Sequence, residues 1–274
     1  MSPLVLFKGE ALPYKLVPGA WCLVPGAWCL PPYKLKFTTN KKETHMNIQG
    51  FQKLTMLDFP GKTACTVFTG RCNLRCPFCH NAGLVLAPDD TPISEEEIFS
   101  YLSKRQGILD GVAITGGEPL LQKDIDAFLR RIKAMGFLTK LDTNGFFPDA
   151  LERLLGEGLV DYAAMDVKNS PGKYAFTCGR DTVDLTKPER SMRLLKESGI
   201  DYELRTTVIG GFHTLPDIEE VGRWIEGAPR YYLQAFKDSG ILREGSGYPL
   251  PEEEMIAMRD TARRYVPICE LRGI

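Results

Sequence analysis

The chain has 274 residues, of which 25% are charged, and its formal net charge is -1 at pH 7. This length allows a large domain with its own hydrophobic core. The near-neutral charge and the dispersed Lys and Arg residues give no electrostatic reason to expect a nucleic-acid partner or an anionic membrane. No run of roughly eighteen apolar residues is present to span a bilayer. Eight cysteines are too few for a disulfide scaffold in a chain of this size, so we expect the protein to lie in a reducing cytoplasm.

Residues 1–45 differ from the rest of the chain. A heptad that begins at Val17 is repeated unchanged from Val24. No helical or strand period runs through this region, and it lacks the order of a secretory signal. We interpret it as a disordered extension. The alternative is a second metal or docking element built on Cys22 and Cys29.

From Met46, a plausible natural start, strand-like and helix-like segments alternate, which predicts one domain over 46–274 with a core at about 58–236. Apolar runs predict strands over 63–69, 111–115, 137–142, 162–167, 202–209 and 231–236. Amphipathic runs predict helices over 95–105, 123–135, 150–155, 188–197 and 218–226, with Ser94 capping the first. A final helix over 252–265 and an edge strand over 267–271 form the tail. This alternation predicts an α/β fold with a parallel sheet, either doubly wound or closed toward a barrel.

Three cysteines, Cys72, Cys76 and Cys79, follow the first predicted strand with the spacing C-x3-C-x2-C. A structural zinc site normally has four protein ligands, and electron-transfer iron-sulfur clusters usually have four cysteines. Three thiolates in one loop therefore indicate a metal centre with an open coordination position. An open position implies chemistry at the metal.

Polar and glycine-rich motifs follow the next strands at the point where each strand ends. They are Gly116-Gly117-Glu118-Pro119, Asp142-Thr143-Asn144-Gly145 and Asp166-Val167-Lys168, and Arg205 lies on the fifth strand. In parallel α/β folds the ligand site lies at the carboxyl ends of the strands. The sequence therefore predicts one site that combines these motifs with the cysteine loop.

The run CNLRCPFC and the later GGEP together resemble the radical S-adenosylmethionine (SAM) superfamily. Its members hold a 4Fe-4S cluster by three cysteines and bind the amine and carboxylate of SAM at the fourth iron. Asp58-Phe59-Pro60-Gly61-Lys62, the DTNG motif and Met165-Asp166-Val167-Lys168 are similar to the activases of glycyl-radical enzymes. The segment Gly50 to Gly61 is most similar to anaerobic ribonucleoside-triphosphate reductase activating proteins. The resemblance covers about 47–236.

This resemblance implies a partial (β/α)6 TIM-like barrel and an activase that cleaves SAM reductively to a 5'-deoxyadenosyl radical. The radical would install a glycyl radical on a partner enzyme. The chemistry would be carried by the cluster and SAM, so no catalytic side chain is expected. A flavodoxin or ferredoxin would supply the electron. The partner's glycine loop would enter through the open side of the barrel, which Asp58 to Lys62 could line.

The resemblance also implies roles for the residues around SAM. Gly116 and Gly117 permit a backbone approach that a Cβ would block, and Glu118 would accept from the ammonium of SAM. Lys168 would pair with the SAM carboxylate. Phe78 would cover the cluster or stack near adenine. A solvated Glu in a turn and a surface lysine are the alternatives for Glu118 and Lys168.

Five further residues are expected at the cofactor. Asp142, Thr143 and Asp166 would organise the SAM carboxylate together with a monovalent cation, although the first two could simply form the turn at Asn144-Gly145. Arg205 would contact the carboxylate or the incoming peptide, with an inter-strand salt bridge as the alternative. Gln234 stands where relatives carry a histidine directed at the ribose, and could substitute for it.

The remaining candidate ligands receive structural interpretations. His80 follows a cluster ligand and is expected outside the first shell or in packing, because adjacent residues rarely reach one metal with good geometry. Cys65, Cys178 and Cys269 are scattered and are expected to be buried thiols. The connection over 81–94 is too short for a ferredoxin-like insertion.

Three functional alternatives stay open beside the reductase activase. One is an activase of another glycyl-radical enzyme such as pyruvate formate-lyase. Another is a radical SAM enzyme that modifies a small molecule or peptide, which predicts extra substrate-binding length. The last is a non-enzymatic zinc or electron-transfer module. Reconstitution with iron and sulfide separates the last from the others.

Overall fold

The computed structural model describes residues 16–18, 33–35, 46–88, 91–237 and 247–274. The chain divides into two compact units, Met1–Glu43 and Thr44–Ile274. In the first unit, β1 (Leu16–Pro18) pairs antiparallel with β2 (Tyr33–Leu35). The predicted disordered extension otherwise lies outside the described residues.

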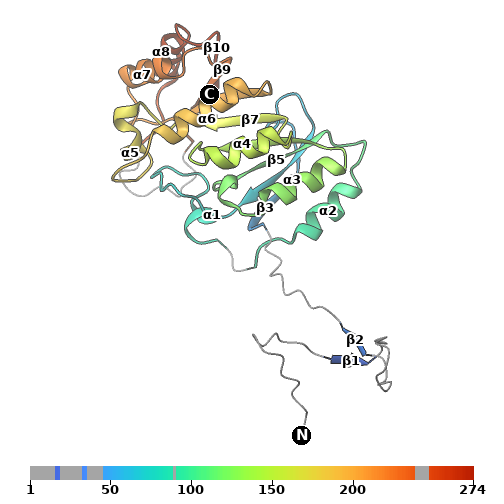
Figure 1. Cartoon of the computed structure of the whole chain (residues 1–274). Coiled ribbons are helices and arrows are strands. Elements are labelled where there is room, and N and C mark those ends of the chain that lie inside the picture. The colour runs from blue at the N-terminus through green and yellow to red at the C-terminus, as the bar shows by residue number, and fades with distance from the viewer. Residues whose placement is uncertain (1–15, 19–32, 36–45, 89–90, 238–246) are drawn as a thin grey trace. The chain divides into compact units, whose positions relative to one another are not determined.

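The second unit is built on an eight-stranded sheet in the order β10-β9-β8-β7-β6-β5-β4-β3 (Figure 1). Neighbouring strands from β4 to β10 are parallel. They are β4 (Ala64–Thr69), β5 (Gly111–Gly116), β6 (Leu138–Thr143), β7 (Tyr162–Asp166), β8 (Asp201–Val208), β9 (Arg230–Ala235) and β10 (Ile268–Arg272). The six predicted strands and the predicted edge strand are confirmed. Because β3 and β10 are the two ends of the order, the sheet is not closed.

The eighth strand, β3 (Ile48–Thr55), was not predicted and pairs antiparallel with β4. Its register shifts between Ile48 and Gly50 and again between Gln52 and Thr55. Each irregularity breaks the alternation of buried and exposed residues that identifies a strand in a sequence. The sheet therefore has eight strands where the barrel was expected to have six.

Helices connect the parallel strands, as the alternating pattern predicted (Figure 1). They are α1 (Ala82–Leu86), α2 (Glu95–Ser103), α3 (Ile125–Ala134), α4 (Pro148–Gly156), α5 (Tyr174–Thr177), α6 (Thr186–Glu197), α7 (Leu215–Trp224) and α8 (Glu252–Ala262). Ser94 caps α2 as predicted, since its side chain accepts a hydrogen bond from the amide of Glu97 at 3.2 Å. The short helices α1 and α5 were not predicted.

The two faces of the sheet have different chemistry. On β8, Tyr202, Leu204 and Val208 are buried in the main hydrophobic core. Their neighbours Glu203 and Arg205 point to the opposite, concave face because side chains alternate along a strand. The concave face of the sheet is thus charged, while the convex face packs against helices.

The segment Asp58 to Lys62 joins the end of β3 to the start of β4, and so lies at the amino ends of the parallel strands. Phe59 is buried there with Ala64 and Tyr162. The cysteine loop follows the other end of β4. Asp58 accepts a hydrogen bond from the hydroxyl of Thr66 on β4 at 2.5 Å. The expectation that Asp58 to Lys62 lines the entrance for a partner's loop stays a prediction.

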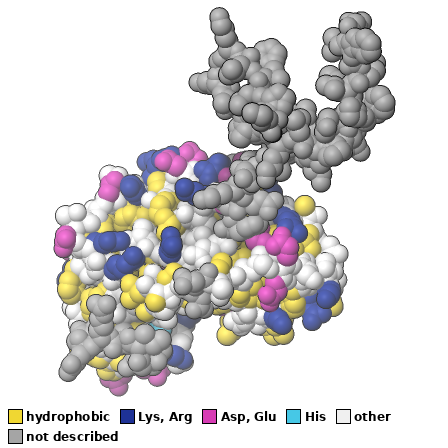
Figure 2. Space-filling view, turned by 90° about the horizontal axis from the view of Figure 1, so that it is seen from below, with side chains coloured by type: hydrophobic (Ala, Val, Ile, Leu, Met, Phe, Trp, Pro, Cys, Tyr) yellow, Lys and Arg dark blue, Asp and Glu magenta, His cyan; other side chains and the backbone are white. Residues whose placement is uncertain are grey.

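Two observations concern the surface of the described residues. No helix there is long and apolar enough to cross a bilayer. On the face in Figure 2, basic, acidic and hydrophobic side chains are interspersed over the described residues.

Candidate active site

A cavity of about 650 Å³ opens at the carboxyl ends of the parallel strands. The cysteine loop and α1 form one wall, and the ends of β5 to β9 form most of the rest. The predicted site residues that line it are Cys72, Cys76, Phe78, Cys79, Gly116, Gly117, Asp142, Thr143, Asp166, Lys168, Arg205 and Gln234. Only Glu118, among the predicted site residues, lies outside the lining. The volume lies in the range of small-molecule and cofactor sites.

The cysteine loop is held against the end of β5 by the two glycines of the GGEP motif. The amides of Gly117 and Glu118 donate to the carbonyls of Thr69 and Arg71 at 2.8 and 2.9 Å. A Cβ on Gly117 would lie 1.8 Å from the carbonyl oxygen of Arg71. Gly116 has φ 111°, which L side chains rarely adopt. The glycines thus permit the loop, rather than only the cofactor, to approach the strand.

A second segment holds the loop from the other side, and the sequence did not predict it. The amide of Arg75 donates to the carbonyl of Cys178 at 2.9 Å. Gly179, with φ 62°, lies so close that a Cβ would meet the carbonyl oxygen of Arg75 at 2.1 Å. The guanidinium of Arg180 donates to the carbonyl of Asn73. Residues 178–180 therefore form the seat of the cysteine loop.

The three loop thiols differ in their environments. Burial raises the pKa of Cys72 to about 11 and also raises the pKa of Cys79. The pKa of Cys76 is lowered, chiefly because the thiol of Cys178 donates a hydrogen bond to it. Cys178 is buried, as predicted, and so are Cys65 and Cys269. The position of Cys178 beside Cys76 could not be predicted from the sequence, because about a hundred residues separate the two cysteines.

The thiols are not gathered around one point. Among the described residues, no group of three His, Cys, Asp or Glu side chains is placed to hold a single metal ion. A structural zinc ion needs such a group, whereas an iron-sulfur cluster takes each thiolate at a different iron. Three thiols in the lining of one cavity fit the three-cysteine ligation of such a cluster.

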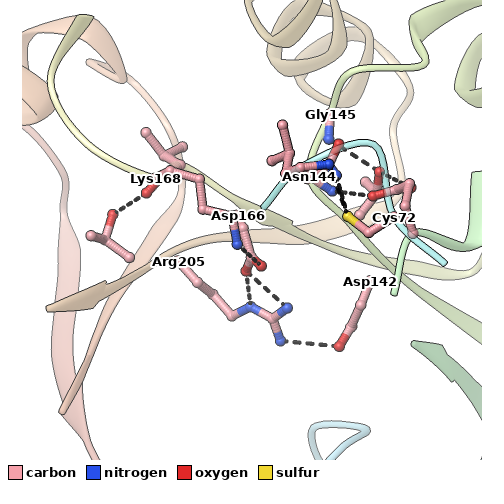
Figure 3. Close-up of polar contacts among 12 residues, drawn as sticks. Cys72, Asp142, Asn144, Gly145, Asp166, Lys168 and Arg205 are labelled. Carbon is pink, nitrogen blue, oxygen red and sulfur yellow. Dashed lines mark hydrogen bonds and ion pairs between the residues drawn. The ribbon is translucent and has the colours of Figure 1, made fainter. Parts of the chain in front are cut away.

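A row of alternating charges crosses the concave face below the cysteine loop (Figure 3). The guanidinium of Arg205 bridges Asp166 at 3.0 Å and Asp142 at 3.3 Å, and the ammonium of Lys168 lies 2.8 Å from Asp166. Burial alone would raise the pKa of Asp166, but the charges of Lys168 and Arg205 lower it to about 2. The pKa of Asp142 is likewise lowered, against the effect of burial, by Arg205 and Lys140. The salt bridge weighed for Arg205 is present, and its contact with a cofactor stays a prediction.

Glu118 lies beneath the cavity, with only 1% of its surface exposed. Its carboxylate accepts from the hydroxyl of Thr143 at 2.8 Å and from the amides of Leu120 and Asn144 at 3.1 and 2.8 Å. Burial raises its pKa to about 7. Both oxygens of Glu118 thus accept hydrogen bonds from the protein. The contact of Glu118 with the ammonium of SAM stays a prediction.

Asn144, expected only as a turn residue, links this carboxyl to the cysteine loop. Its side-chain amide lies 3.6 Å from the sulfur of Cys72 and donates to Asn73 at 2.8 Å (Figure 3). Glu118 therefore holds the turn, and the turn contacts the first cysteine. The sequence signal for this role was the Asn-Gly pair, which had a sufficient explanation as a turn.

Aromatic rings fill the wall beside the last two cysteines. Phe78 is buried and packs edge-on against Phe212 at 5.2 Å between ring centroids. The ring of His80 lies 5.4 Å from that of Phe236, which agrees with the packing role expected for it. His213 was missed: it is buried, and its Nε2 donates to the carbonyl of Lys168 at 2.8 Å. This bond fixes the backbone from which Lys168 projects.

Comparison with known sequences identifies relatives of the whole described domain. The family model of the Radical SAM superfamily matches residues 66–225. A protein of Methanocaldococcus jannaschii named as a glycyl-radical enzyme activating enzyme is 31% identical over 233 residues, which cover 83% of this chain and 96% of that protein. The pyruvate formate-lyase-activating enzyme of Listeria monocytogenes is 27% identical over 237 residues, covering 77% and 93% of the two chains.

Solved structures agree with the sequence relatives at the level of the fold. SuiB of Streptococcus suis bound to S-adenosylmethionine has a TM-score of 0.58 at 16% identity. The match covers 74% of this chain and 48% of SuiB. QueE from Escherichia coli has a TM-score of 0.51 at 16% identity, and the match covers 85% of this chain and 96% of QueE.

Proposed function

We propose that this chain, which belongs to the radical SAM superfamily, installs a glycyl radical on an anaerobic ribonucleoside-triphosphate reductase. Enzymes of this family use a 4Fe-4S cluster and SAM, and the M. jannaschii relative is named as an activating enzyme. The choice of the reductase as partner rests on the segment Gly50 to Gly61. The Listeria relative, named for pyruvate formate-lyase, makes that enzyme the alternative partner.

The observation that supports this proposal most is that three thiols and a charged row line one cavity. Cys72, Cys76 and Cys79 would hold the cluster. Lys168 would offer its ammonium to the carboxylate of SAM, and Arg205 lies beside it to add positive charge. A carboxylate that enters the cavity would therefore meet fixed cations, so its desolvation would be compensated.

When bound, the cluster and SAM supply a 5'-deoxyadenosyl radical, and the chain's own residues position and protect the reacting groups. Phe78 lines the cavity and packs with Ile209 and Phe212 in a buried apolar cluster, which would exclude water from that side. Gln234 lines the cavity at the end of β9, where it could reach a ribose hydroxyl. Glu118 and Asn144 would keep the cysteine loop in place.

The unclosed sheet supports a protein substrate. With β3 and β10 unpaired to each other, the concave face is open between the two edges of the sheet. An extended loop that carries a glycine could reach the cavity from that side. We further propose a flavodoxin or ferredoxin as the electron donor and the cytoplasm as the location.

Electron paramagnetic resonance tests the proposal directly. The reconstituted, reduced chain should hold about four irons and, with SAM and the reductase, should produce the doublet of a glycyl radical. Cys76→Ala should abolish both SAM cleavage and the doublet. A doublet with pyruvate formate-lyase but none with the reductase would refute the partner. One tightly held zinc and no iron would refute the activase itself.

A further inference from the structure

Lys140 is a charged residue inside the protein that the sequence did not single out. It lies on β6, two residues before Asp142, and therefore faces the same concave surface one step farther from the cavity. Its side chain is 2% exposed, and its ammonium lies 2.5 Å from Oδ1 of Asp142. Charged side chains are rarely buried to this extent unless they are paired.

The neighbouring strands leave room for this side chain. In the sheet register, Lys140 stands beside Ala113 on β5 and Tyr162 on β7, and Asp142 stands beside Ala164 on β7. The two alanines leave space into which Lys140 and Arg205 can extend. The hydroxyl of Tyr162 is directed to Glu203, at 2.7 Å.

Both carboxylates of the charged row have a cation at each oxygen. Asp142 has Lys140 at Oδ1 and Arg205 at Oδ2, and Asp166 has Arg205 at Oδ1 and Lys168 at Oδ2. The hydroxyl of Thr143 donates to Glu118 and accepts from the amide of Gly145 at 3.1 Å. The oxygens expected to bind a monovalent cation are thus already in contact with protein groups.

The net charge of the row also argues against a metal ion at Asp142. With Lys140 included, the row contains three cationic and two anionic side chains, so it carries one excess positive charge. Glu203, the next carboxylate on this face, is paired with Arg272 at 2.6 and 2.8 Å. A metal ion at Asp142 would raise the excess in a poorly solvated region, where like charges repel strongly. It would also have to displace Lys140 or Arg205.

We propose that Lys140 is a positioning residue that takes the place of a metal cation: its ammonium holds Asp142 and, through it, Arg205 for cofactor binding. SAM binding to this chain then needs no monovalent metal ion. The inference rests on the proposed function only in taking SAM as the ligand of the cavity.

The first test needs no variant. The dissociation constant of SAM from the reconstituted chain is measured by equilibrium dialysis in potassium, sodium and tetramethylammonium chloride at equal ionic strength. The last cation is too large to sit between two carboxylates. We expect the same constant in all three salts. Binding that is about ten-fold tighter in potassium or sodium, a difference of about 1.4 kcal/mol, would overturn the proposal.

The second test removes the ammonium. Lys140→Met should weaken SAM binding about ten-fold or more in tetramethylammonium chloride, the order expected for a lost charged hydrogen bond. Potassium or sodium should restore part of the affinity, because a metal ion can enter the freed position. Unchanged affinity in every salt would refute the role of Lys140.

Two further variants make the result specific. Lys140→Arg keeps a cation at Asp142 and should retain salt-independent binding, which guards against a Met variant that folds poorly. Lys133→Met is the matched control, since Lys133 pairs with Asp161 at 2.6 Å outside the cavity. It should bind SAM like the parent chain in all salts. Because the readout is binding, a failed glycyl-radical assay and a failed salt test are separate results.

Discussion

At the scale of single residues, Glu118 gives the clearest pH prediction. Its pKa is raised by burial from 4.5 to about 7. A carboxyl whose pKa is higher in the folded state stabilises the fold below its unfolded pKa and loses that contribution as pH rises through the folded pKa. The free energy of unfolding should therefore fall by on the order of 3 kcal/mol between about pH 4.5 and 7, because Glu118 ionises over that range. Glu118→Gln should remove this loss, so its stability relative to the parent should improve over that window in urea unfolding.

Glu203 provides a contrast of opposite sign. Burial would raise its pKa, but the hydrogen bonds and charge of Arg272 lower it. Its contribution is present above the unfolded pKa and is lost as pH falls. Glu203→Gln should therefore lose stability relative to the parent as pH rises. A Glu118→Gln variant that behaved in the same way would contradict the assignment of a raised pKa to Glu118.

Residue types and spacing were enough to predict that the cysteine loop and the motifs after the next strands share one cavity, because motifs at the carboxyl ends of parallel strands must meet at one edge. Three residues could not be found in this way. Cys178 and His213 act through contacts between segments far apart in the chain, and neither belongs to a motif. Lys140 lies within a strand, where a lysine ordinarily indicates a solvated face. Only the curvature of the sheet places it inside.

At the scale of elements, the seat of the cysteine loop can be tested at Gly179. An alanine there would be strained at φ 62° and would push against the carbonyl of Arg75. Gly179→Ala should cost about 1–3 kcal/mol, and its main effect should be on the loop. Iron content after anaerobic reconstitution should fall clearly below that of the parent, while far-UV circular dichroism stays the same.

Gly172 is the matched control for this substitution. It lies in the short 3-10 turn Pro171–Lys173 of the same segment, and a Cβ there would meet nothing within 4 Å. Gly172→Ala should change stability by no more than about 0.5 kcal/mol and leave the iron content unchanged. Equal iron loss in both variants would mean that the segment, rather than the close approach at Gly179, matters.

A partly exposed arginine on the last strand pairs with a buried carboxylate. Arg272 on β10 donates two hydrogen bonds to Glu203, which is otherwise bonded only through Tyr162 among the contacts described. Arg272→Met would leave a buried carboxylate without its cation and should cost about 3–5 kcal/mol. Thermal denaturation should show this as a drop of about 2–4 °C per kcal/mol.

A double variant and a surface control separate charge from packing. Adding Glu203→Gln to Arg272→Met should recover part of the lost stability, because no unpaired charge then stays buried. Arg130→Met removes a half-exposed partner of Glu157 and should cost about 0–1 kcal/mol. If the double variant were no more stable than the single one, the loss in both would reflect the missing packing of Arg272 on the ring of Tyr232, whose centroid lies 3.4 Å from the guanidinium.

Elements whose apolar residues follow a regular pattern along the sequence were predicted, and elements without such a pattern were not. Parallel strands covered on the convex face by helices appear as apolar runs, so β4 to β9 were recognised. The bulged β3 has no such period, and the four-residue α5 is shorter than any pattern that periodicity can identify. These two elements matter for the site, since β3 forms one edge of the open sheet and α5 leads into the seat of the cysteine loop.

At the scale of the whole molecule, the described core and cavity residues fall within 46–274. Met46 is 2% exposed and Ile48 is 0% exposed, and both belong to the main core. The amide of Met46 donates to the carboxylate of Glu95 at 2.8 Å, so an amino terminus at this position would still face an acceptor. The boundary of the folding unit should therefore lie just before Met46.

Two truncated chains test this boundary. A chain that begins at Met46 should denature at the temperature of the full chain and bind SAM with the same affinity. A chain that begins at Gly50 loses Met46 and Ile48, and with Ile48 the carbonyl that accepts from the amide of Ile93 at 2.8 Å. It should lose about 4 kcal/mol or more, the cost of emptying two large core positions. If the chain from Met46 were as unstable as the chain from Gly50, residues before Met46 would belong to the folding unit. If the chain from Gly50 kept full stability, the packing of Met46 and Ile48 would not define where the domain begins.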